Sequence, residues 1–78
     1  MKIAPFKMRV TPEQSARVQE ILFKNGYMWL SGADYAHCFS YPFLYLGIAL
    51  ACGERQETFD GDNEPELTCE QFINLYDK

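Results

Sequence analysis

Residues 11–26 read TPEQSARVQEILFKNG, and this stretch decides the fold because it carries a complete set of helix signals. Thr11 can accept a backbone N–H at the helix start, and Gln14 can bond back to Thr11, which makes a capping box. Pro12 falls at the first helical position, where its missing N–H costs nothing. Gly26 suits the left-handed residue that ends a helix. The predicted helix of about 13 residues carries its apolar face at Val18, Ile21 and Leu22.

Strand patterns lie on both sides of this helix. Residues 6–10 alternate apolar and basic side chains, so we expect a strand with its apolar side chains buried and with Lys7 and Arg9 in solvent. Residues 27–30 follow the helix directly and predict a second, short strand. Residues 31–42 contain several turn-forming residues, so we expect a loop with extended stretches.

The longest apolar run, residues 43–52, predicts a β-hairpin. Gly47 allows a turn between a strand over residues 43–46 and an antiparallel return over residues 48–52, which Gly53 ends. A single buried helix over the same run is the alternative, because periodicity does not separate the two for short apolar stretches. The run is too short for a transmembrane helix, which needs about 20 residues.

The helix-start pattern recurs near the C-terminal end. Thr68 and Gln71 form a second capping box, and Leu67 and Phe72 are placed for a hydrophobic staple. The predicted helix is short, so it must pack against the rest of the chain to be stable. Its apolar stripe consists of Cys69, Phe72, Ile73 and Tyr76.

The predicted order of elements is β-α-β-β-β-α in a single domain over residues 1–78. Consecutive strands with short links favour antiparallel pairing. We therefore expect an α+β fold in which a small antiparallel sheet carries two helices packed on one face. A chain of 78 residues, 47% of them hydrophobic, builds only a small core. We accordingly expect the protein to gain stability as a homodimer or higher oligomer.

Cysteine usage and the first residues predict a cytoplasmic protein. The cysteines, at positions 38, 52 and 69, are odd in number and widely spaced, so no disulfide framework is expected. No apolar run follows Lys2, so we expect no signal peptide. Both observations favour reduced thiols in the cytoplasm and a protein that makes no contact with a membrane.

Charge is distributed unevenly along the chain, whose formal net charge is −4. Residues 1–52 hold five bases and three acids, whereas residues 53–78 hold two bases and eight acids. Such an acidic chain lacks the electrostatic footprint of a nucleic-acid-binding protein. Its acidic part is either a solvated surface or a face complementary to a basic partner.

Several motifs resemble a family of small tailed-phage and prophage proteins. The stretch VTPEQS at 10–15, followed by VQEILF at 18–23 and NGYMW at 25–29, is similar to the family pattern TPEQS…VQE-LF-NGY-W. The strand PFLYL at 42–46 and the segment PELTCEQF at 65–72 continue the resemblance. The resemblance implies an early or accessory phage protein that acts on host machinery or host defence in the host cytoplasm. It implies no catalytic residue.

Rings occupy every odd position from 35 to 45. If this stretch is extended, one face carries an uninterrupted row of rings, which suits protein recognition or stacking on a base. The alternative is that several of these rings fill the core, and Pro42 interrupts any regular ladder. The residues of this aromatic row are Tyr35, His37, Phe39, Tyr41, Phe43 and Tyr45.

Catalytic and metal-binding patterns are weak in this sequence. His37 and the three cysteines lack the close pairs that a zinc site requires. Residues 60–71 fail as a calcium loop, because Pro65 stands where glycine is needed and Gln71 where glutamate is needed. We therefore predict a protein that is not an enzyme and that needs no cofactor or metal.

The first functional hypothesis is a non-enzymatic accessory protein that binds a host protein, including one of a defence system, and inhibits or redirects it. Rings buried at an interface supply binding energy, and acids at its rim steer association. The predicted partner-binding residues are Tyr35, Phe39, Tyr41, Tyr45, Asp60, Asp62 and Glu64.

The second hypothesis is an oligomer that sequesters a small ligand, such as a nucleotide signal, in pockets lined by rings. The phosphates of such a ligand would need basic side chains near the rings. The candidates are Lys7, Arg9 and Arg55.

Overall fold

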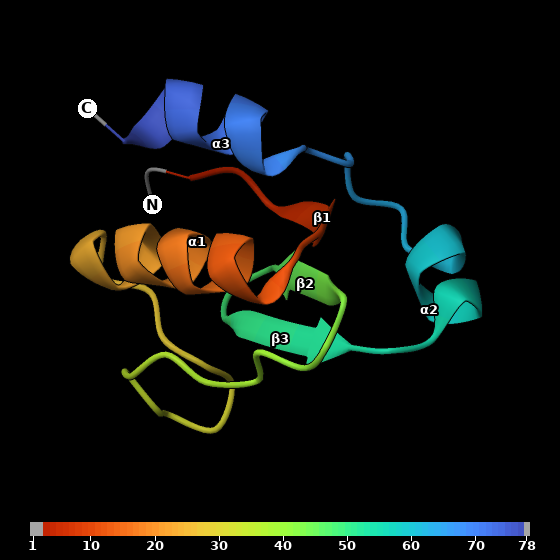
Figure 1. Cartoon of the computed structure of the whole chain (residues 1–78), viewed down its shortest axis with the longest axis horizontal. Helices are drawn as coiled ribbons and strands as arrows, with labels where there is room; N and C mark the ends of the chain where they lie inside the picture. The colour runs from red at the N-terminus through yellow and green to blue at the C-terminus, as the bar shows by residue number, and fades with distance from the viewer. Residues whose placement is uncertain (1–2, 78) are drawn as a thin grey trace.

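The computed structural model describes residues 3–77 and has a three-stranded antiparallel sheet at its centre (Figure 1). The strands are β1 (Phe6–Arg9), β2 (Phe43–Leu46) and β3 (Leu50–Gly53), in the order β1-β2-β3. In the register of the sheet, Leu46 lies between Phe6 on β1 and Leu50 on β3. The predicted hairpin is therefore confirmed, and the alternative of one helix over residues 43–52 is wrong.

Helices α1 (Pro12–Lys24) and α3 (Cys69–Tyr76) begin at the two predicted capping boxes. The Thr11 hydroxyl accepts from the backbone N–H of Gln14, whose side-chain oxygen accepts from the N–H of Thr11. Thr68 and Gln71 repeat both bonds at the start of α3. Together with the sheet, these helices show the predicted α+β class. Among the residues that the structure describes, no helix combines the length and the apolar character that crossing a bilayer requires.

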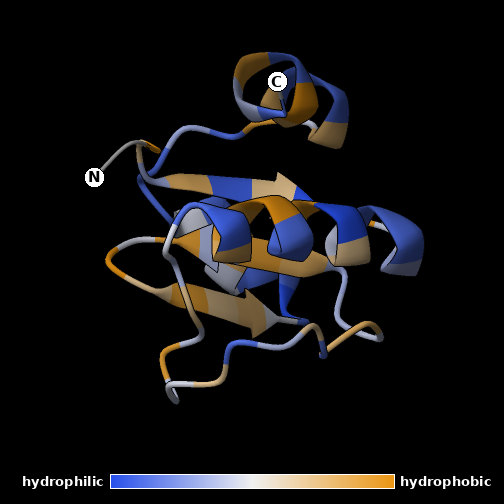
Figure 2. Ribbon diagram, turned by 90° about the vertical axis from the view of Figure 1, so that its left-hand side faces the viewer, coloured by the Kyte–Doolittle hydropathy of each residue, from blue (hydrophilic) through white to orange (hydrophobic). Residues whose placement is uncertain are grey.

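One face of the sheet, the main face, carries the larger core. Successive side chains of a strand point to opposite faces, so alternate strand residues reach this core. Helix α1 covers the main face, and α3 packs beside α1, where Phe72 lies with its ring centroid 5.3 Å from that of Phe6. In Figure 2 the hairpin is coloured largely as hydrophobic. The buried side chains include Phe6, Met8, Val18, Ile21, Leu22, Leu44, Leu46, Leu50 and Phe72.

The opposite face of the sheet, the back face, is covered by a third helix, α2 (Gln56–Gly61), which lies across the sheet from α1 (Figure 1). Its one buried side chain, Phe59, stacks on Phe43 with ring centroids 4.5 Å apart. The expectation that the helices pack on one face only is therefore wrong. Helix α2 has neither an apolar stripe nor a side-chain cap at Arg55, so no local pattern predicts it.

Residues 27–30 form an isolated bridge in place of the predicted strand. Trp29 pairs in parallel with Leu50, and both are buried. The chain turns away at once, because the N–H of Trp29 donates to the carbonyl of Ala33 and that of Gly32 donates to the carbonyl of Trp29. Gly32 has a φ of 92°, which glycine adopts without strain.

Both outer strands of the sheet have their free edge covered by a short segment. On β1, the N–H of Lys7 donates to the carbonyl of Pro65, and the N–H of Leu67 donates to the carbonyl of Lys7. On β3, Leu50 exchanges the equivalent backbone bonds with residues 28 and 30. Each outer strand is therefore paired at one position along its outer edge.

Candidate functional site

The aromatic row does not form one face of a strand, so that prediction is wrong. Residues 31–42, called the aromatic loop below, contain no strand. Cys38 adopts a φ of 62°, and the N–H of Tyr41 donates back to its carbonyl, so the chain turns where the row would need to be extended. Phe43 and Tyr45 consequently lie on the back face of the sheet, apart from the rings of the loop.

A buried glutamine on α1 holds the aromatic loop in place. The Gln19 side chain donates to the carbonyl of His37 at 2.7 Å and accepts from the N–H of His37 at 3.0 Å, and it also donates to the Ser15 hydroxyl. The His37 ring lies between the rings of Trp29 and Tyr35, with centroid distances of 4.4 and 5.0 Å. The middle of the loop is therefore fixed from α1 and from the core.

The role of Gln19 is not predicted from the sequence, although its position on the apolar side of the helix indicates a buried contact. Ser15 and Gln19 share the buried side of α1 with Val18 and Leu22, and both polar side chains are fully buried. Buried polar groups must find hydrogen-bond partners, so two of them on an apolar helix face indicate a segment packed against that face. The loop beginning at residue 31 is that segment.

Three rings of the aromatic loop remain exposed to solvent. The exposed fraction is 65% for Tyr35, 41% for Phe39 and 37% for Tyr41. The carbonyl of Pro42 accepts from the N–H of Val10, and the next residue begins β2 opposite the end of β3. Tyr41 therefore lies at the end of the sheet from which the chain continues into α2.

The predicted acidic side chains lie on α2 and just after it. Asp60 and Glu64 are exposed, whereas Asp62 is half-buried. Asp60 accepts from the Gln56 side chain at 2.8 Å, and the Asp62 carboxylate accepts from the N–H of Glu64 at 2.8 Å. Asp62 thus holds the turn after α2, and the other two acids face solvent. Residues 54–66 contain six acids and one base.

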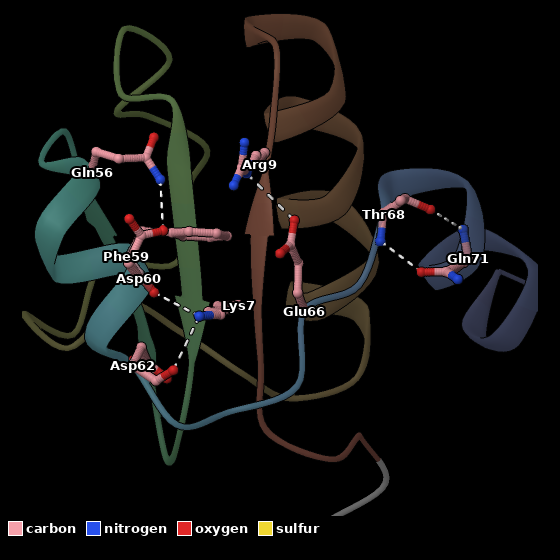
Figure 3. A network of polar contacts seen from close by, with 9 residues as sticks. All are labelled: Lys7, Arg9, Gln56, Phe59, Asp60, Asp62, Glu66, Thr68 and Gln71. Atoms are coloured by element: carbon pink, nitrogen blue, oxygen red, sulfur yellow. Dashed lines mark hydrogen bonds and ion pairs between the residues drawn. The ribbon is translucent and has the colours of Figure 1, made fainter.

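Lys7 is buried on the back face, which corrects the expectation that it lies in solvent. Only 9% of it is exposed, and its Nζ donates to the carbonyls of Phe59 at 2.6 Å and Asp62 at 3.0 Å (Figure 3). The same ammonium lies 4.6 Å from the centroid of the Phe59 ring. A cation at the last carbonyls of a helix stabilises them. Lys7 therefore caps α2 and binds it to the sheet.

The bases proposed as phosphate ligands are all engaged within the chain. Lys7 is bound to α2 as described. Arg9 pairs with Glu66 at 3.4 Å and lies over the Phe59 ring, and Arg55 lies 3.9 Å from Glu57. The rings near these bases belong to the back-face core. This arrangement offers little support for a nucleotide pocket at these residues.

Tyr45 belongs to the back-face core and not to the exposed surface that carries Tyr35. Its ring lies against Phe59, and its hydroxyl is buried without a hydrogen-bond partner among residues 3–77. Burial raises the pKa of Tyr45, and the nearby carboxylates of Asp62 and Asp60 raise it further. The predicted role of Tyr45 in direct partner contact is therefore not supported by its position.

Two shallow hollows lie where α1 and α3 begin. One, of about 370 Å³, is lined by residues that include Arg17, Cys69 and Ile73, and the other, of about 390 Å³, includes Arg9 and Glu66. Burial raises the pKa of Cys69, and the neighbouring Arg17 opposes this shift. Arg17 is itself paired with Asp77. The hollows contain none of the predicted partner-binding residues.

Residues 3–77 contain no group of three or more histidine, cysteine or acidic side chains placed to hold a metal ion. The His37 ring instead packs at a tilt against the rings of Trp29 and Tyr35, and its Nδ1 lies 2.9 Å from the carbonyl of Tyr35. Comparison of the chain with protein-family models, with curated proteins and with solved structures finds no match.

Proposed function

We propose that the chain is a small non-enzymatic binding protein that occupies a basic surface of a partner protein and inhibits or redirects that partner. The observation that carries this proposal is the pair of features at one end of the sheet. One is the anchored loop with exposed rings, whose Tyr41 lies at that end, and the other is the acidic helix α2, into which the chain continues from the same end. Rings and acids together suit a surface rich in Arg and Lys.

The exposed rings supply the contact energy in this proposal. Tyrosine and phenylalanine bury large areas at an interface and are common where binding energy is concentrated. Gln19 and the core already hold the loop that bears Phe39 and Tyr41. A loop that is ordered before binding loses little conformational entropy on binding, which favours affinity.

The acids supply the attraction at longer range. Residues 54–66 carry six acids against Arg55, which lies beside Glu57. A surface of one sign speeds association with a partner of the opposite sign and makes the association rate sensitive to salt. The partner chemistry that fits is therefore a cationic protein surface and not a nucleic acid.

The resemblance to tailed-phage proteins makes a bacterial host protein the proposed partner, with a component of host defence included. The site of action is then the host cytoplasm. Because the core is small, self-association as a homodimer or higher oligomer is part of the proposal.

The test is capture of partners from a bacterial lysate by the tagged full chain, with quantitative mass spectrometry and then binding kinetics on the captured protein. The double variant Phe39→Ala with Tyr41→Ala should bind the captured protein about 30-fold more weakly, mainly through faster dissociation. The matched control is Leu75→Ala, an exposed side chain on α3. Equal capture by the ring variant, or an equal loss with Leu75→Ala, would contradict the proposal.

The acidic part is tested separately by Asp60→Asn with Glu64→Gln, which leaves the turn-holding Asp62 intact. Association with the captured protein should slow, and its dependence on salt should flatten. Glu20→Gln, an exposed acid on α1, is the control. A salt response unchanged by the double variant would place the interface elsewhere.

A further inference from the structure

An exposed apolar patch lies along the outer edge of β3. Leu30 is 75% exposed, Met28 is 46% exposed, and Ile48, in the hairpin turn, is 89% exposed. The carbonyl of Met28 and the N–H of Leu30 both bond to the backbone of Leu50. Trp29 lies between them and is buried in the main core, so the side chains on either side of it project away from that core. Met28, Leu30 and Ile48 are called the edge patch below.

Helix α2 does not cover the edge patch, because it packs at the other end of the hairpin. Its buried Phe59 contacts Phe43 and Tyr45, and Phe43 is paired with Gly53, the last residue of β3. The edge patch lies by the turn between β2 and β3 and beside Leu50, the first residue of β3. The helix that shields the rest of the back face therefore leaves these side chains in solvent.

The edge patch belongs to an uncharged side of the molecule. Between Lys24 and Glu54 the sequence contains one acidic or basic residue, Asp34. The same stretch carries six of the seven large apolar side chains that are exposed among residues 3–77. In Figure 1 this part of the chain lies on the side of the sheet away from β1 and α3. Few charges together with exposed methionine and aromatic residues are typical of the centre of a protein–protein interface.

The absence of charge favours a second copy of the chain as the occupant of this surface. Each copy has a formal net charge of −4, so two copies repel each other at long range. A two-fold axis also brings the side chains near it next to their own equivalents. An uncharged surface meets its own copy without placing like charges together. A cationic partner, in contrast, finds no acid in the edge patch to pair with.

The uncharged side is also large enough for a dimer. A stable interface covers about 800 Å² of each subunit, which is about one sixth of the 4939 Å² that the chain exposes. Residues 25–53 form more than a third of the chain. The edge patch supplies an apolar centre, and small uncharged residues beside it, such as Ser31, Gly47 and Ala51, supply a rim.

We propose that the edge patch is the centre of a two-fold symmetric dimer interface, in which Met28, Leu30 and Ile48 of one copy pack against the same residues of a second copy. The inference rests on the self-association that forms part of the proposed function, and it assigns the surface that mediates it. The acidic helix α2 of each copy, at the other end of the hairpin, stays free for a partner.

Charge substitutions in the edge patch test both the dimer and its symmetry. One double variant is Leu30→Lys with Ile48→Lys, and the other is Leu30→Glu with Ile48→Glu. Both positions are exposed, so both variants should fold, which circular dichroism checks. In analytical ultracentrifugation the parent should dimerise at micromolar concentration, and each variant alone should dimerise about 30-fold more weakly, because like charges then face each other. An equimolar mixture of the two variants should restore the dimer, since lysines of one copy then meet glutamates of the other.

The matched control is Leu75→Lys, which makes the same kind of change at an exposed leucine on α3 and should leave dimerisation unchanged. A parent that sediments only as a 9.1 kDa species up to about 1 mM would overturn the proposal. Double variants that dimerise as well as the parent, an equal loss with Leu75→Lys, or a mixture that stays monomeric would overturn it as well.

Partner capture separates this proposal from the partner-binding function. The charge variants keep Phe39, Tyr41 and the acids of α2, so they should still capture the partner as monomers. If the parent dimerises and the mixture restores the dimer while no partner is captured, partner binding fails and the dimer interface stands. If a partner is captured through the exposed rings while the parent stays monomeric, the dimer interface fails and partner binding stands.

Discussion

The two faces of the sheet are held by different means. On the main face, side chains from β1, α1 and α3 form one cluster in which Leu22 and Phe72 are fully buried. On the back face, α2 contributes a single buried ring, Phe59, and Lys7 binds the end of that helix. The main face spreads its stabilisation over many apolar contacts, whereas α2 is held on the back face by one ring of its own and by one buried ammonium.

This difference predicts two units of different stability. A helix as short as α2 is unstable on its own and persists only through its contacts. Regions with few buried apolar contacts open at lower free energy than the core. We therefore expect α2, with its acidic side chains, to detach from the back face while the main face stays folded.

The largest effect is expected from the main face. Phe72→Ala removes a fully buried ring that packs against Phe6 and Tyr76. Such a change lowers the free energy of unfolding by about 3–5 kcal/mol, and the total free energy of unfolding of a domain of this size is little larger than that. The variant should be largely unfolded by circular dichroism at room temperature. A cooperative thermal transition close to that of the parent would contradict the assigned role of α3 in the core.

The matching change on the back face is Phe59→Ala, which removes a ring buried as deeply as Phe72. We expect a cost of about 3 kcal/mol, at the low end for a buried phenylalanine, because α2 can detach without unfolding the rest. Hydrogen exchange should lose protection in residues 56–61 and retain it in α1. Equal loss of protection in both helices would show that the two faces form one cooperative unit.

Lys7→Met tests the buried ammonium while keeping an unbranched apolar side chain of similar length. The change leaves the carbonyls of Phe59 and Asp62 without their donor, at a cost of about 2 kcal/mol. Lys24→Met, at an exposed position in the last turn of α1, is the control and should change stability far less. The denaturant midpoints of the two variants measure these effects, and equal shifts would contradict the capping role of Lys7.

The smallest effects concern the helix starts. Thr11→Ala breaks the capping box of α1 and should lower the free energy of unfolding by about 1 kcal/mol, which chemical denaturation measures.

Arg55→Asn supplies α2 with the side-chain cap that it lacks and should stabilise this helix by about 0.5 kcal/mol. Amide hydrogen exchange in residues 56–61 measures this gain. If Arg55→Asn leaves this exchange unchanged, the stability of α2 is set by Phe59 and Lys7 alone.

The sequence predicts the main face well because its signals are local. Thr11 with Gln14, Thr68 with Gln71, and Gly47 within an apolar run each act on residues a few positions away. The back face escapes prediction because no local helix signal surrounds Phe59 and because its contacts are made with other elements, Phe43 on β2 and Lys7 on β1. Nothing near Lys7 indicates that it caps a helix at Phe59, with which it shares a sequence separation of 52.

The candidate site likewise contains features that the sequence predicts and features that it does not predict. The exposed rings at 35, 39 and 41 and the acids after residue 59 are visible in the sequence, and the structure leaves most of them at the surface. The anchoring by Gln19 and the burial of the Tyr45 hydroxyl are not visible. Each of these depends on a contact between two separate elements, α1 with the aromatic loop in the first case and β2 with α2 in the second.

The covered edges of the sheet carry a consequence for how the protein behaves at high concentration. An unpaired outer strand is a template on which further chains add and from which fibres grow. The segments at Pro65–Leu67 and at residues 28–30 pair with one residue on each outer strand, Lys7 on β1 and Leu50 on β3. Strand addition at these two positions would first have to displace a segment of the same chain, which lowers the tendency of this short aromatic-rich protein to aggregate through its sheet edges.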